Sequence, residues 1–478
     1  MKRAVSLIAV GLFALGITFA GGISVSPKKV GIEGASISCR ETPFVARVFF
    51  PSGSDAVDPA CEPVLKELAR RIADNPDAIV EIRGYYHIAG DGAAGSPQLA
   101  AKRAEAVRNR LISYDNSIAK RVLVQPATRP SQCYRGQDGS LDPKIQAENR
   151  RAEISVRLSE PATKKFGTYD PGEIVRALDS SGDLYRFARL VEDNPLFFIL
   201  ITVASADKIP AAAKIRAKLG KKIKSPAARQ RIFVAWGDID ANVEIAVSPI
   251  WVITKPFRQA DVRGELSADA VKISGGDAQI VGVYAGDGCF VAPAANEWNL
   301  SKIPDPTRTY FVSGWRTEGA AKRRLWSDKI SFSGWEKGNS VEETMILANY
   351  RIDQLSAPED AGSRANRDLA ARQISLIADK LGTPVTVEIA GFTDDTGDPE
   401  KNRQMSLFWA QKEFEQIKPL LEYYLGEKIK MDGQNSGRCG NVKIEIVGKS
   451  SADENPKIKE DTPAGRIAKR RVEIKIYQ

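Results

Sequence analysis

The sequence predicts an α+β protein in which a two-layer β/α sandwich module occurs twice in full and once in reduced form, together with an antiparallel β-sandwich domain. Three observations lead to this prediction. An amphipathic helix that ends at Asn-Pro before an apolar strand occurs at residues 65–76 and again at 184–195. The last predicted strand of each full module, called its closing strand below, begins with two arginines, at 150–154 and again at 470–474. Between these repeats, residues 249–340 lose the helical periodicity and have the pattern of short strands.

The first twenty residues have the features of a secretory signal peptide. Lys2 and Arg3 precede an uncharged, mostly apolar run at 4–17, and Thr18 and Ala20 then place small residues at the positions that a signal peptidase reads. We expect residues 1–20 to be removed and the mature chain to be exported. An uncleaved anchor helix is the alternative, because residues 4–20 are at the short limit for crossing a bilayer.

The first full module is expected over residues 40–160. Its first helix places Leu65, Leu68 and Ile72 on one face and ends at Asn-Pro, because proline disfavours helical geometry in the residue before it. The elements expected after it are a strand at 78–83, a helix at 99–112, a short strand at 121–125 and a closing strand at 152–158. Apolar and polar residues alternate in the closing strand, so one face of the sheet is expected to be buried.

The reduced module is expected over residues 166–248. Its strand at 197–203 is apolar at nearly every position, which predicts a central strand that is covered on both faces. We expect the helix at 184–193 on one face and a neighbouring module or the β-domain on the other. Eight basic residues follow within 214–231. Such a run is typical of a solvated helix face, and contact with anionic wall polymer or lipid headgroups is the alternative.

The remaining chain is expected to form two further domains. Residues 249–340 should form the antiparallel β-sandwich domain, because short β-type runs there are separated by Gly, Pro, Asp and Asn. The last full module is expected over residues 345–478. Its predicted elements are a helix at 368–381, a strand at 385–390, a long helix at 401–424 and strands at 442–447 and 472–477.

Composition argues against several classes of function. The chain has a single histidine, His87, so one imidazole would have to serve any His-built metal site or Ser-His-Asp triad. Its five cysteines form no CxxC pair. The net charge of +9 is spread too thinly over 478 residues to indicate nucleic acid. We therefore expect no enzyme, no cofactor, no metal site and no nucleic-acid partner.

Both full modules contain a distinctive motif. The last module contains GFTDDTGDPEKN at 391–402, followed by Met-Ser, and the first module contains Arg103-Ala104 in its long helix and Asn149-Arg150-Arg151 before its closing strand. These segments resemble the OmpA-like family of peptidoglycan-binding domains, which includes the C-terminal domains of OmpA and MotB and the Pal type, and which has Leu-Ser where the last module has Met-Ser. The resemblance covers residues 40–160 and 345–478, and it implies a β/α sandwich that binds peptidoglycan without cleaving it.

The family's ligand is the diaminopimelate residue of the stem peptide, whose free end carries an ammonium and a carboxylate. The resemblance implies an aspartate that faces the ammonium and an arginine that faces the carboxylate. Asp394 remains in the last module, where Trp409 stands at the arginine position. Arg103 remains in the first module, where His87 stands at the aspartate position. Each full module therefore keeps half of the pair, and the reduced module keeps neither.

The last module is the better candidate for binding. We expect Arg403, Arg470 or Arg471 to replace its missing helix arginine. The residues expected at a peptidoglycan site are Asp394, Thr393, Asn402, Arg403, Arg470 and Arg471 in the last module, and Arg103 and Arg150 in the first. The alternative is that both full modules are degenerate and serve as scaffold.

The sequence therefore indicates a structural protein of the cell envelope, exported to the periplasm and associated with the outer membrane. It is expected to attach non-covalently to peptidoglycan and to anchor an envelope assembly. Its expected partners are the diaminopimelate stem peptide and other envelope or outer-membrane proteins. The alternative is an interaction protein whose degenerate modules bind protein partners rather than cell wall.

Overall fold

The computed structural model describes most of the residues predicted to form the three β/α modules. The described ranges are 46–86, 96–128, 142–194, 197–224, 228–229, 231–249, 342–352, 354–381, 384–451 and 462–477, with seven strand segments between residues 17 and 331. The chain divides into two compact units. The smaller comprises residues 1–39, 223–231 and 257–336, and the larger comprises residues 40–222, 232–256 and 337–478.

The smaller unit contains two antiparallel sheets. One has the strand order β1-β2-β11 and the other has the order β13-β12-β14-β15. Their bounds are β1 Ile17–Phe19, β2 Ile23–Val25, β11 Ile273–Gly275, β12 Ile280–Ala285, β13 Phe290–Ala294, β14 Thr309–Glu318 and β15 Ala321–Ser331. The antiparallel strands expected within 249–340 are thus confirmed for the described segments. The sandwich and the removal of residues 1–20 stay predictions.

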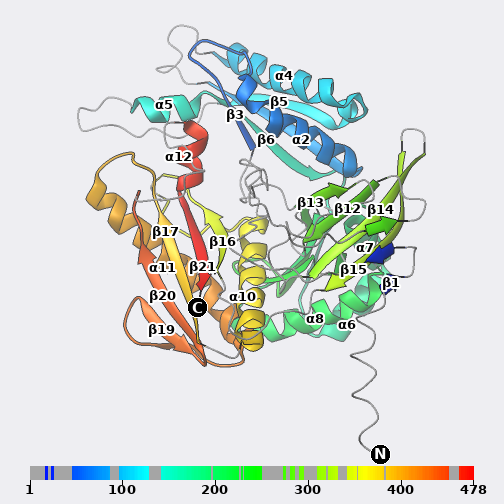
Figure 1. The fold of residues 1–478 in the computed structure, drawn as a ribbon, viewed down its shortest axis with the longest axis vertical. Coiled ribbons are helices and arrows are strands. Elements are labelled where there is room, and N and C mark those ends of the chain that lie inside the picture. Colours follow the sequence, from blue (N-terminus) through cyan, green and yellow to red (C-terminus); the bar gives the residue numbers. More distant parts are fainter. Residues whose placement is uncertain are drawn as a thin grey trace, which may run out of the picture. The chain divides into compact units, whose positions relative to one another are not determined.

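The first sheet of the larger unit has the strand order β3-β6-β4-β5 (Figure 1). The elements in chain order are β3 Ala46–Phe49, α2 Glu62–Asp74, β4 Ala78–Tyr85, α4 Pro97–Tyr114, β5 Val122–Thr128, α5 Pro143–Asn149 and β6 Arg151–Leu158. Strands β4 and β5 are parallel and the other pairs are antiparallel. Helices α2 and α4 contribute Leu68, Ile72 and Val107 to the core that they form with the sheet.

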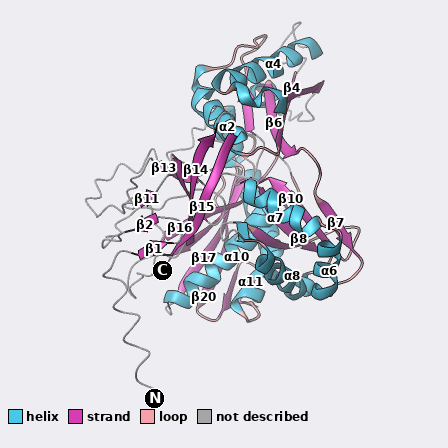
Figure 2. Cartoon of the chain, turned by 90° about the vertical axis from the view of Figure 1, so that its right-hand side faces the viewer, coloured by secondary structure: helices cyan, strands magenta, loops and turns pink. Residues whose placement is uncertain are grey.

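The second sheet has the order β7-β10-β8-β9, again with one parallel pair, β8 with β9. Its elements are β7 Thr163–Phe166, α6 Pro171–Ser180, α7 Asp183–Asp193, β8 Phe197–Val203, α8 Ile209–Lys222, β9 Ile232–Trp236 and β10 Val243–Pro249. The predicted β/α order of the middle segment is therefore confirmed. Figure 2 shows α7 and α8 beside β8 and β10.

The third sheet has the order β16-β21-β17-β20-β19-β18. Its elements are β16 Glu342–Asn349, α10 Ala361–Leu381, β17 Val385–Phe392, α11 Pro399–Leu425, β18 Lys430–Met431, β19 Ser436–Cys439, β20 Val442–Gly448, α12 Pro463–Lys469 and β21 Arg471–Tyr477. The first four strands repeat the order of the other two sheets: an edge strand, the closing strand, the central strand and a strand parallel to it. The hairpin of β18 and β19 extends only this sheet.

Strand β8 is central in its sheet and all seven of its residues are buried, as predicted. Phe198 and Leu200 pack on Phe233 of β9 and on Ala365 of helix α10. The helix that covers the second face of this sheet therefore belongs to the neighbouring third sheet. Because α10 also packs against α11 and β16, it serves two sheets at once.

The repeated Asn-Pro sequence produces the same helix end twice. The side-chain amide of Asn75 donates to the carbonyl oxygen of Arg71 at 2.7 Å, and that of Asn194 donates to Leu190 at 2.8 Å. Asn194 also accepts from the backbone N–H of Asp77 at 3.0 Å, which joins the first sheet to the second. Each asparagine side chain thus bonds a carbonyl in the last turn of its helix, and the Leu190 carbonyl also accepts from the backbone N–H of Asn194 at 3.1 Å.

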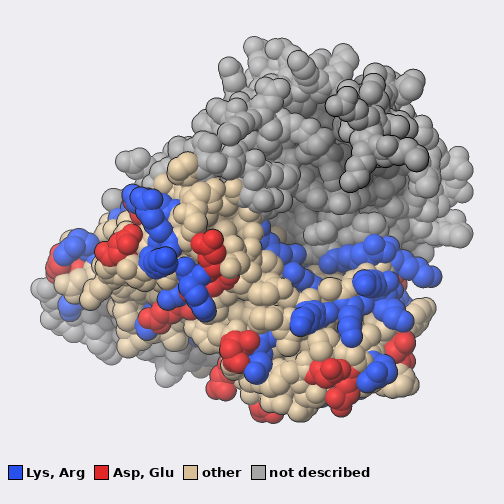
Figure 3. All heavy atoms as spheres, turned by 90° about the horizontal axis from the view of Figure 1, so that it is seen from below, with Lys and Arg blue, Asp and Glu red and all other residues tan. Residues whose placement is uncertain are grey.

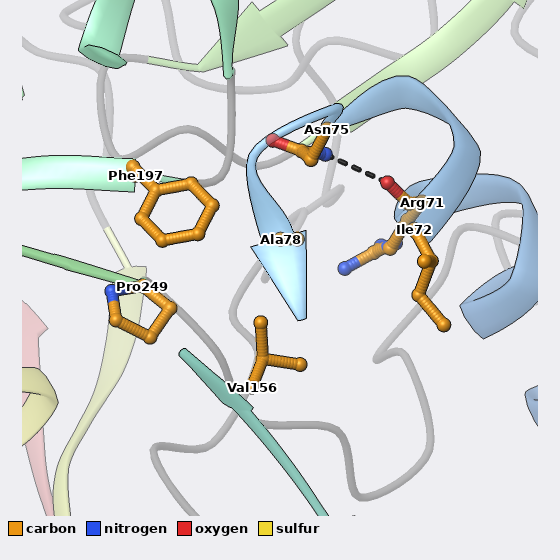
Figure 4. Close-up of a pocket in the computed structure, with 7 residues that line it drawn as sticks. All are labelled: Arg71, Ile72, Asn75, Ala78, Val156, Phe197 and Pro249. Carbon is orange, nitrogen blue, oxygen red and sulfur yellow. Dashed lines mark hydrogen bonds between the residues drawn. The ribbon is translucent and has the colours of Figure 1, made fainter. Parts of the chain in front are cut away.

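The contact between the first and second sheets is tightly packed. Figure 4 shows Phe197 and Pro249 opposite Ala78 and Val156, with the bond from Asn75 to Arg71 above them in the view. The space between these side chains is too small to hold a water molecule. The contact therefore joins two modules and offers no room for a ligand.

Two glycines allow a strand to pass very close to the long helix beside it. A Cβ added to Gly84 would lie 1.8 Å from the carbonyl oxygen of Ala100, and one added to Gly391 would lie 1.8 Å from that of Ser406. The first and third modules therefore share one strand–helix contact, and Gly84 corresponds to Gly391.

Replacing Gly391 by alanine should destabilise the fold, because the new methyl group overlaps a backbone oxygen and the helix must move. We expect a loss of about 3 kcal/mol in the free energy of unfolding, measured by urea denaturation. The matched control is Gly167→Ala, since an added Cβ there meets no atom within 4 Å. A Gly391→Ala protein as stable as Gly167→Ala would contradict the close approach.

Candidate functional site

The close-approach glycines define equivalent positions in the two full modules. Their contact partners are Ala100 and Ser406, so the residues three positions further along each helix, Arg103 and Trp409, also correspond. This agrees with the spacing of the sequence motif. The structure therefore shows directly what replaces the helix arginine in the third module.

Arg103 is fully buried and is used within its own module. Its Nε donates to the carbonyl oxygen of Ser54 at 2.9 Å, and its two Nη atoms donate to the carbonyls of Tyr85 and Pro51, each at 3.2 Å. Its guanidinium lies over the ring of Phe50. These bonds hold the loops after β3 and β4 together.

Trp409 takes over part of this structural role. Its Nε1 donates to the carbonyl oxygen of Gln354 at 2.7 Å, and its ring stacks on Tyr350 with 4.7 Å between centroids. The Tyr350 hydroxyl donates to Glu413 at 2.7 Å, and Arg367 is paired with the same buried carboxylate at 2.8 Å. Trp409 thus keeps a bond to the loop after the edge strand but brings no positive charge.

Asp394 lies in the loop after β17 and is 3% exposed. One carboxylate oxygen accepts from the backbone N–H of Thr396 at 3.0 Å, and the other accepts from Nη1 of Arg470. The side chain of Asn402 donates to the carbonyl oxygens of Asp394 and Thr396 at 3.2 and 3.0 Å. Asn402 therefore shapes the loop, and Asp394 supplies its charge.

Arg470 supplies the positive charge at this place. It directly precedes β21 and is 2% exposed. Besides Asp394 it contacts Glu148 of α5, with 2.7 Å between Nη2 and Oε2. Burial opposes the charge of Arg470, but the carboxylates of Glu148 and Asp394 outweigh that effect and raise its pKa. The guanidinium therefore remains charged inside the protein.

A cavity of about 400 Å³ opens beside this ion pair. Asp394, Asp398, Lys401 and Arg470 line its polar side, and Leu355 and Phe408 contribute an apolar side. Three residues that line the cavity each have a buried polar atom without a hydrogen-bond partner within the described ranges: Oγ1 of Thr393, Oγ1 of Thr396 and Nε of Arg470. Buried polar atoms without partners are uncommon, so these three make the Asp394 loop and Arg470 the candidate place for a ligand group.

The other predicted site residues lie elsewhere. Arg403 is exposed and pairs with Glu400 of the same helix at 2.7 Å. Arg471 lies over the ring of Phe392 and bonds Glu473, and Arg150 donates to the carbonyl of Phe50. His87 lies outside the described residues. The structure thus brings together Thr393, Asp394, Asn402 and Arg470, but not Arg403, Arg471, Arg103 or Arg150.

Two contributors were missed by reasoning from the sequence. Glu148 lies directly before the Asn-Arg-Arg motif of the first module, and no local pattern relates it to the third module. Thr396 was overlooked, although an aspartate in a turn typically bonds the backbone N–H two residues further on, as Asp394 does with Thr396.

The basic run at 214–231 begins on α8. Its side chains Lys214, Lys218, Lys221 and Lys222 are exposed. Arg216 differs, because its Nη1 donates to the Tyr424 hydroxyl at 2.6 Å and so belongs to the contact between the second and third sheets. Figure 3 shows Lys and Arg side chains with Asp and Glu among them on this side of the molecule.

Two further properties bear on the class of protein. Among the residues that the structure describes, no cluster of three His, Cys, Asp or Glu side chains could hold a metal ion. None of the described helices is long and apolar enough to cross a membrane.

A charged network in the first module surrounds Glu153 of β6. Its carboxylate accepts from Nε of Arg47 at 3.0 Å, from Nε of Arg151 at 2.9 Å and from the Tyr85 hydroxyl at 2.7 Å. Burial alone would raise the pKa of Glu153. The charges of Arg151 and Arg47 and the Tyr85 bond outweigh it and lower the pKa to about 2.

Replacing Glu153 by glutamine should remove part of the acid sensitivity of the fold. A pKa lowered from 4.5 to about 2 stabilises the folded state above pH 4.5, and this stabilisation is lost as the pH falls towards 2. At about 1.4 kcal/mol per pKa unit, the contribution at neutral pH is about 3 kcal/mol. Urea unfolding should therefore show a difference between wild type and Glu153→Gln that shrinks by this amount between pH 7 and 2.

Glu105→Gln is the control for that experiment, because it removes a half-exposed carboxylate of the same module. Its pH dependence should equal that of the wild type. A difference between wild type and Glu153→Gln that stays constant down to pH 2 would contradict the lowered pKa.

Comparison with known proteins adds a partial family match. A model described as the OmpA family matches residues 49–132, and no curated protein matches the chain. Similar solved structures include the peptidoglycan-associated lipoprotein from Burkholderia pseudomallei, which is 22% identical over 23% of this chain and 89% of that chain, with a TM-score of 0.18. The C-terminal domain of Helicobacter pylori MotB is 20% identical over 24% of this chain and 85% of that chain, with a TM-score of 0.20. The OmpA-like domain of FopA1 from Francisella tularensis is 16% identical over 23% of this chain and 71% of that chain, with a TM-score of 0.19. The family match confirms the predicted OmpA-like resemblance for residues 49–132, and the further copies stay predictions.

Proposed function

We propose that this chain is an exported cell-envelope protein that attaches non-covalently to peptidoglycan through the cavity beside Asp394. The observation that carries the proposal is the buried ion pair of Asp394 and Arg470 beside the cavity. Three of the residues that line this cavity have a buried polar atom without a hydrogen-bond partner within the described ranges. The match of residues 49–132 to the OmpA family supports the same class of protein.

The chemistry of the cavity suits the zwitterionic end of diaminopimelate. Asp394 and Asp398 offer negative charge for the ammonium. A carboxylate has about four acceptor positions, and the described contacts of Asp394 use two of them. Nε of Arg470 and the hydroxyls of Thr393 and Thr396 can donate to the carboxylate. Arg470 would thus supply the charge that Trp409 does not.

The cellular setting forms part of the proposal. The signal-peptide pattern at residues 1–20 supports export of the mature chain to the periplasm, where peptidoglycan and the outer membrane are within reach. Attachment there would let the protein anchor an envelope assembly that includes other envelope or outer-membrane proteins. Binding without cleavage needs no catalytic group, so we propose no enzymatic activity.

A second candidate function is recognition of a protein partner. It is favoured by the apolar side of the cavity, where Leu355 is 68% exposed and lies near Phe408 and the substituted Trp409. A peptide segment with an apolar side chain could use this wall. In that case the envelope partner would bind where the family binds cell wall.

Co-sedimentation of the mature chain with purified sacculi tests the proposal. Asp394→Asn keeps the shape of the side chain and removes its charge. Because hydrogen bonds to charged groups contribute about 1.5–3 kcal/mol, the variant should bind at least about tenfold more weakly. The matched control is Asp432→Asn, an exposed aspartate in the same module, which should bind like the wild type. Equal binding by Asp394→Asn would remove Asp394 from the site, and no sedimentation of the wild type would overturn the proposal in favour of a protein partner.

A further inference from the structure

The second carboxylate that holds Arg470 comes from another module. We infer that the candidate site is shared between two modules: Glu148 of the first module positions the guanidinium of Arg470 in the third, so that ligand binding in the cavity and docking of α5 on α12 strengthen each other. This inference rests on the proposed function and names a positioning residue for it.

The geometry of Glu148 is that of a clamp on two arginines. Its side chain is fully buried. Oε2 accepts from Nη2 of Arg470 at 2.7 Å, and Oε1 accepts from Nη1 of Arg470 at 3.2 Å and from Nε of Arg466 at 3.1 Å. Two parallel bonds to one planar guanidinium restrict its orientation more than a single bond can. Because Glu148 holds Nη1 and Nη2, it fixes the orientation in which Nε of Arg470 remains available to the cavity.

The third module cannot provide this carboxylate itself. Counting back from the paired arginines, Glu148 in the first module corresponds to Ala468 in the third. Helix α5 and helix α12 occupy the same place in their modules, and each begins with a capped turn that contains proline. The first module thus has a carboxylate at the helix position where the third module has only the methyl group of alanine.

The Nε–H group of Arg470 indicates the sign of the coupling. Nη1 and Nη2 are engaged by Glu148 and Asp394, whereas Nε has no partner within the described ranges. A carboxylate in the cavity can bond Nε without displacing Glu148. Each contact therefore holds the guanidinium in the orientation that the other needs, and two events that stabilise one conformation favour each other.

Further contacts join the first module to the third beside the two helices. Nζ of Lys144 lies 2.6 Å from Oδ2 of Asp395, the residue after Asp394. Ile467 of α12 packs against Phe49 at the end of β3. The docked state therefore combines an apolar contact, an exposed ion pair and the buried clamp, and it places the first module beside the loop of the candidate site.

The test uses the full mature chain and the tripeptide L-Ala-D-Glu-meso-diaminopimelate as the probe. Calorimetry measures its affinity for the wild type, Glu148→Gln, Glu148→Asp and the control Glu105→Gln. We expect Glu148→Gln to bind at least tenfold more weakly, Glu148→Asp to recover part of the loss because it retains the charge, and Glu105→Gln to match the wild type. Glu148→Gln with the wild-type affinity would overturn the inference.

Hydrogen exchange separates this inference from the proposed function. In the wild type, the probe should slow exchange over residues 143–149 as well as 463–470, although the first of these segments does not line the cavity. A probe effect restricted to 463–470 would overturn the coupling. If the wild type binds no probe, the proposed function fails, and exchange without probe decides the positioning role: faster exchange over 463–470 in Glu148→Gln than in Glu105→Gln supports it, and equal rates overturn it.

Discussion

The pairing of each closing strand with two neighbours determines the rest of the larger unit. Strand β21 lies between β16 and β17, just as β6 lies between β3 and β4. Because the register of this pairing is fixed, the arginine that begins each closing strand also has a fixed place. Arg151 lies 4.3 Å above the ring of Tyr85, and Arg471 lies 4.2 Å above that of Phe392. One residue earlier in the third module, Arg470 therefore meets the loop that carries Asp394.

Much of the larger unit could be predicted because its elements are encoded locally. The Asn-Pro helix ends, the apolar run Phe197–Val203 and the Thr393-Asp394 loop depend on neighbours in the chain, and short segments of sequence record them. The central place of Phe197–Val203 could be predicted as well, because a strand that is apolar on both faces needs a covering layer on each. The candidate site was predictable to the same extent, since Asp394, Thr393 and Asn402 belong to one continuous motif.

The rest depends on contacts between distant segments. Glu148 meets Arg470 more than three hundred residues further along the chain, so neither local sequence contains a sign of the contact. Trp409 looks like the loss of a binding residue, yet its indole replaces the Arg103 bond to a loop carbonyl. The choice among Arg403, Arg470 and Arg471 was open for the same reason, because only the register of β21 shows which one reaches Asp394.

The sharing of helix α10 by two sheets has a consequence for the order in which the chain is made. Phe198, Leu200 and Phe233 belong to strands that leave the ribosome more than a hundred residues before α10. During that interval one face of the second sheet has no covering layer from the helix. Exposed apolar strands of this kind promote aggregation. The nascent protein would therefore need a chaperone that binds the exposed strands, or slow folding of the middle segment, until helix α10 in the last quarter of the chain has been synthesised.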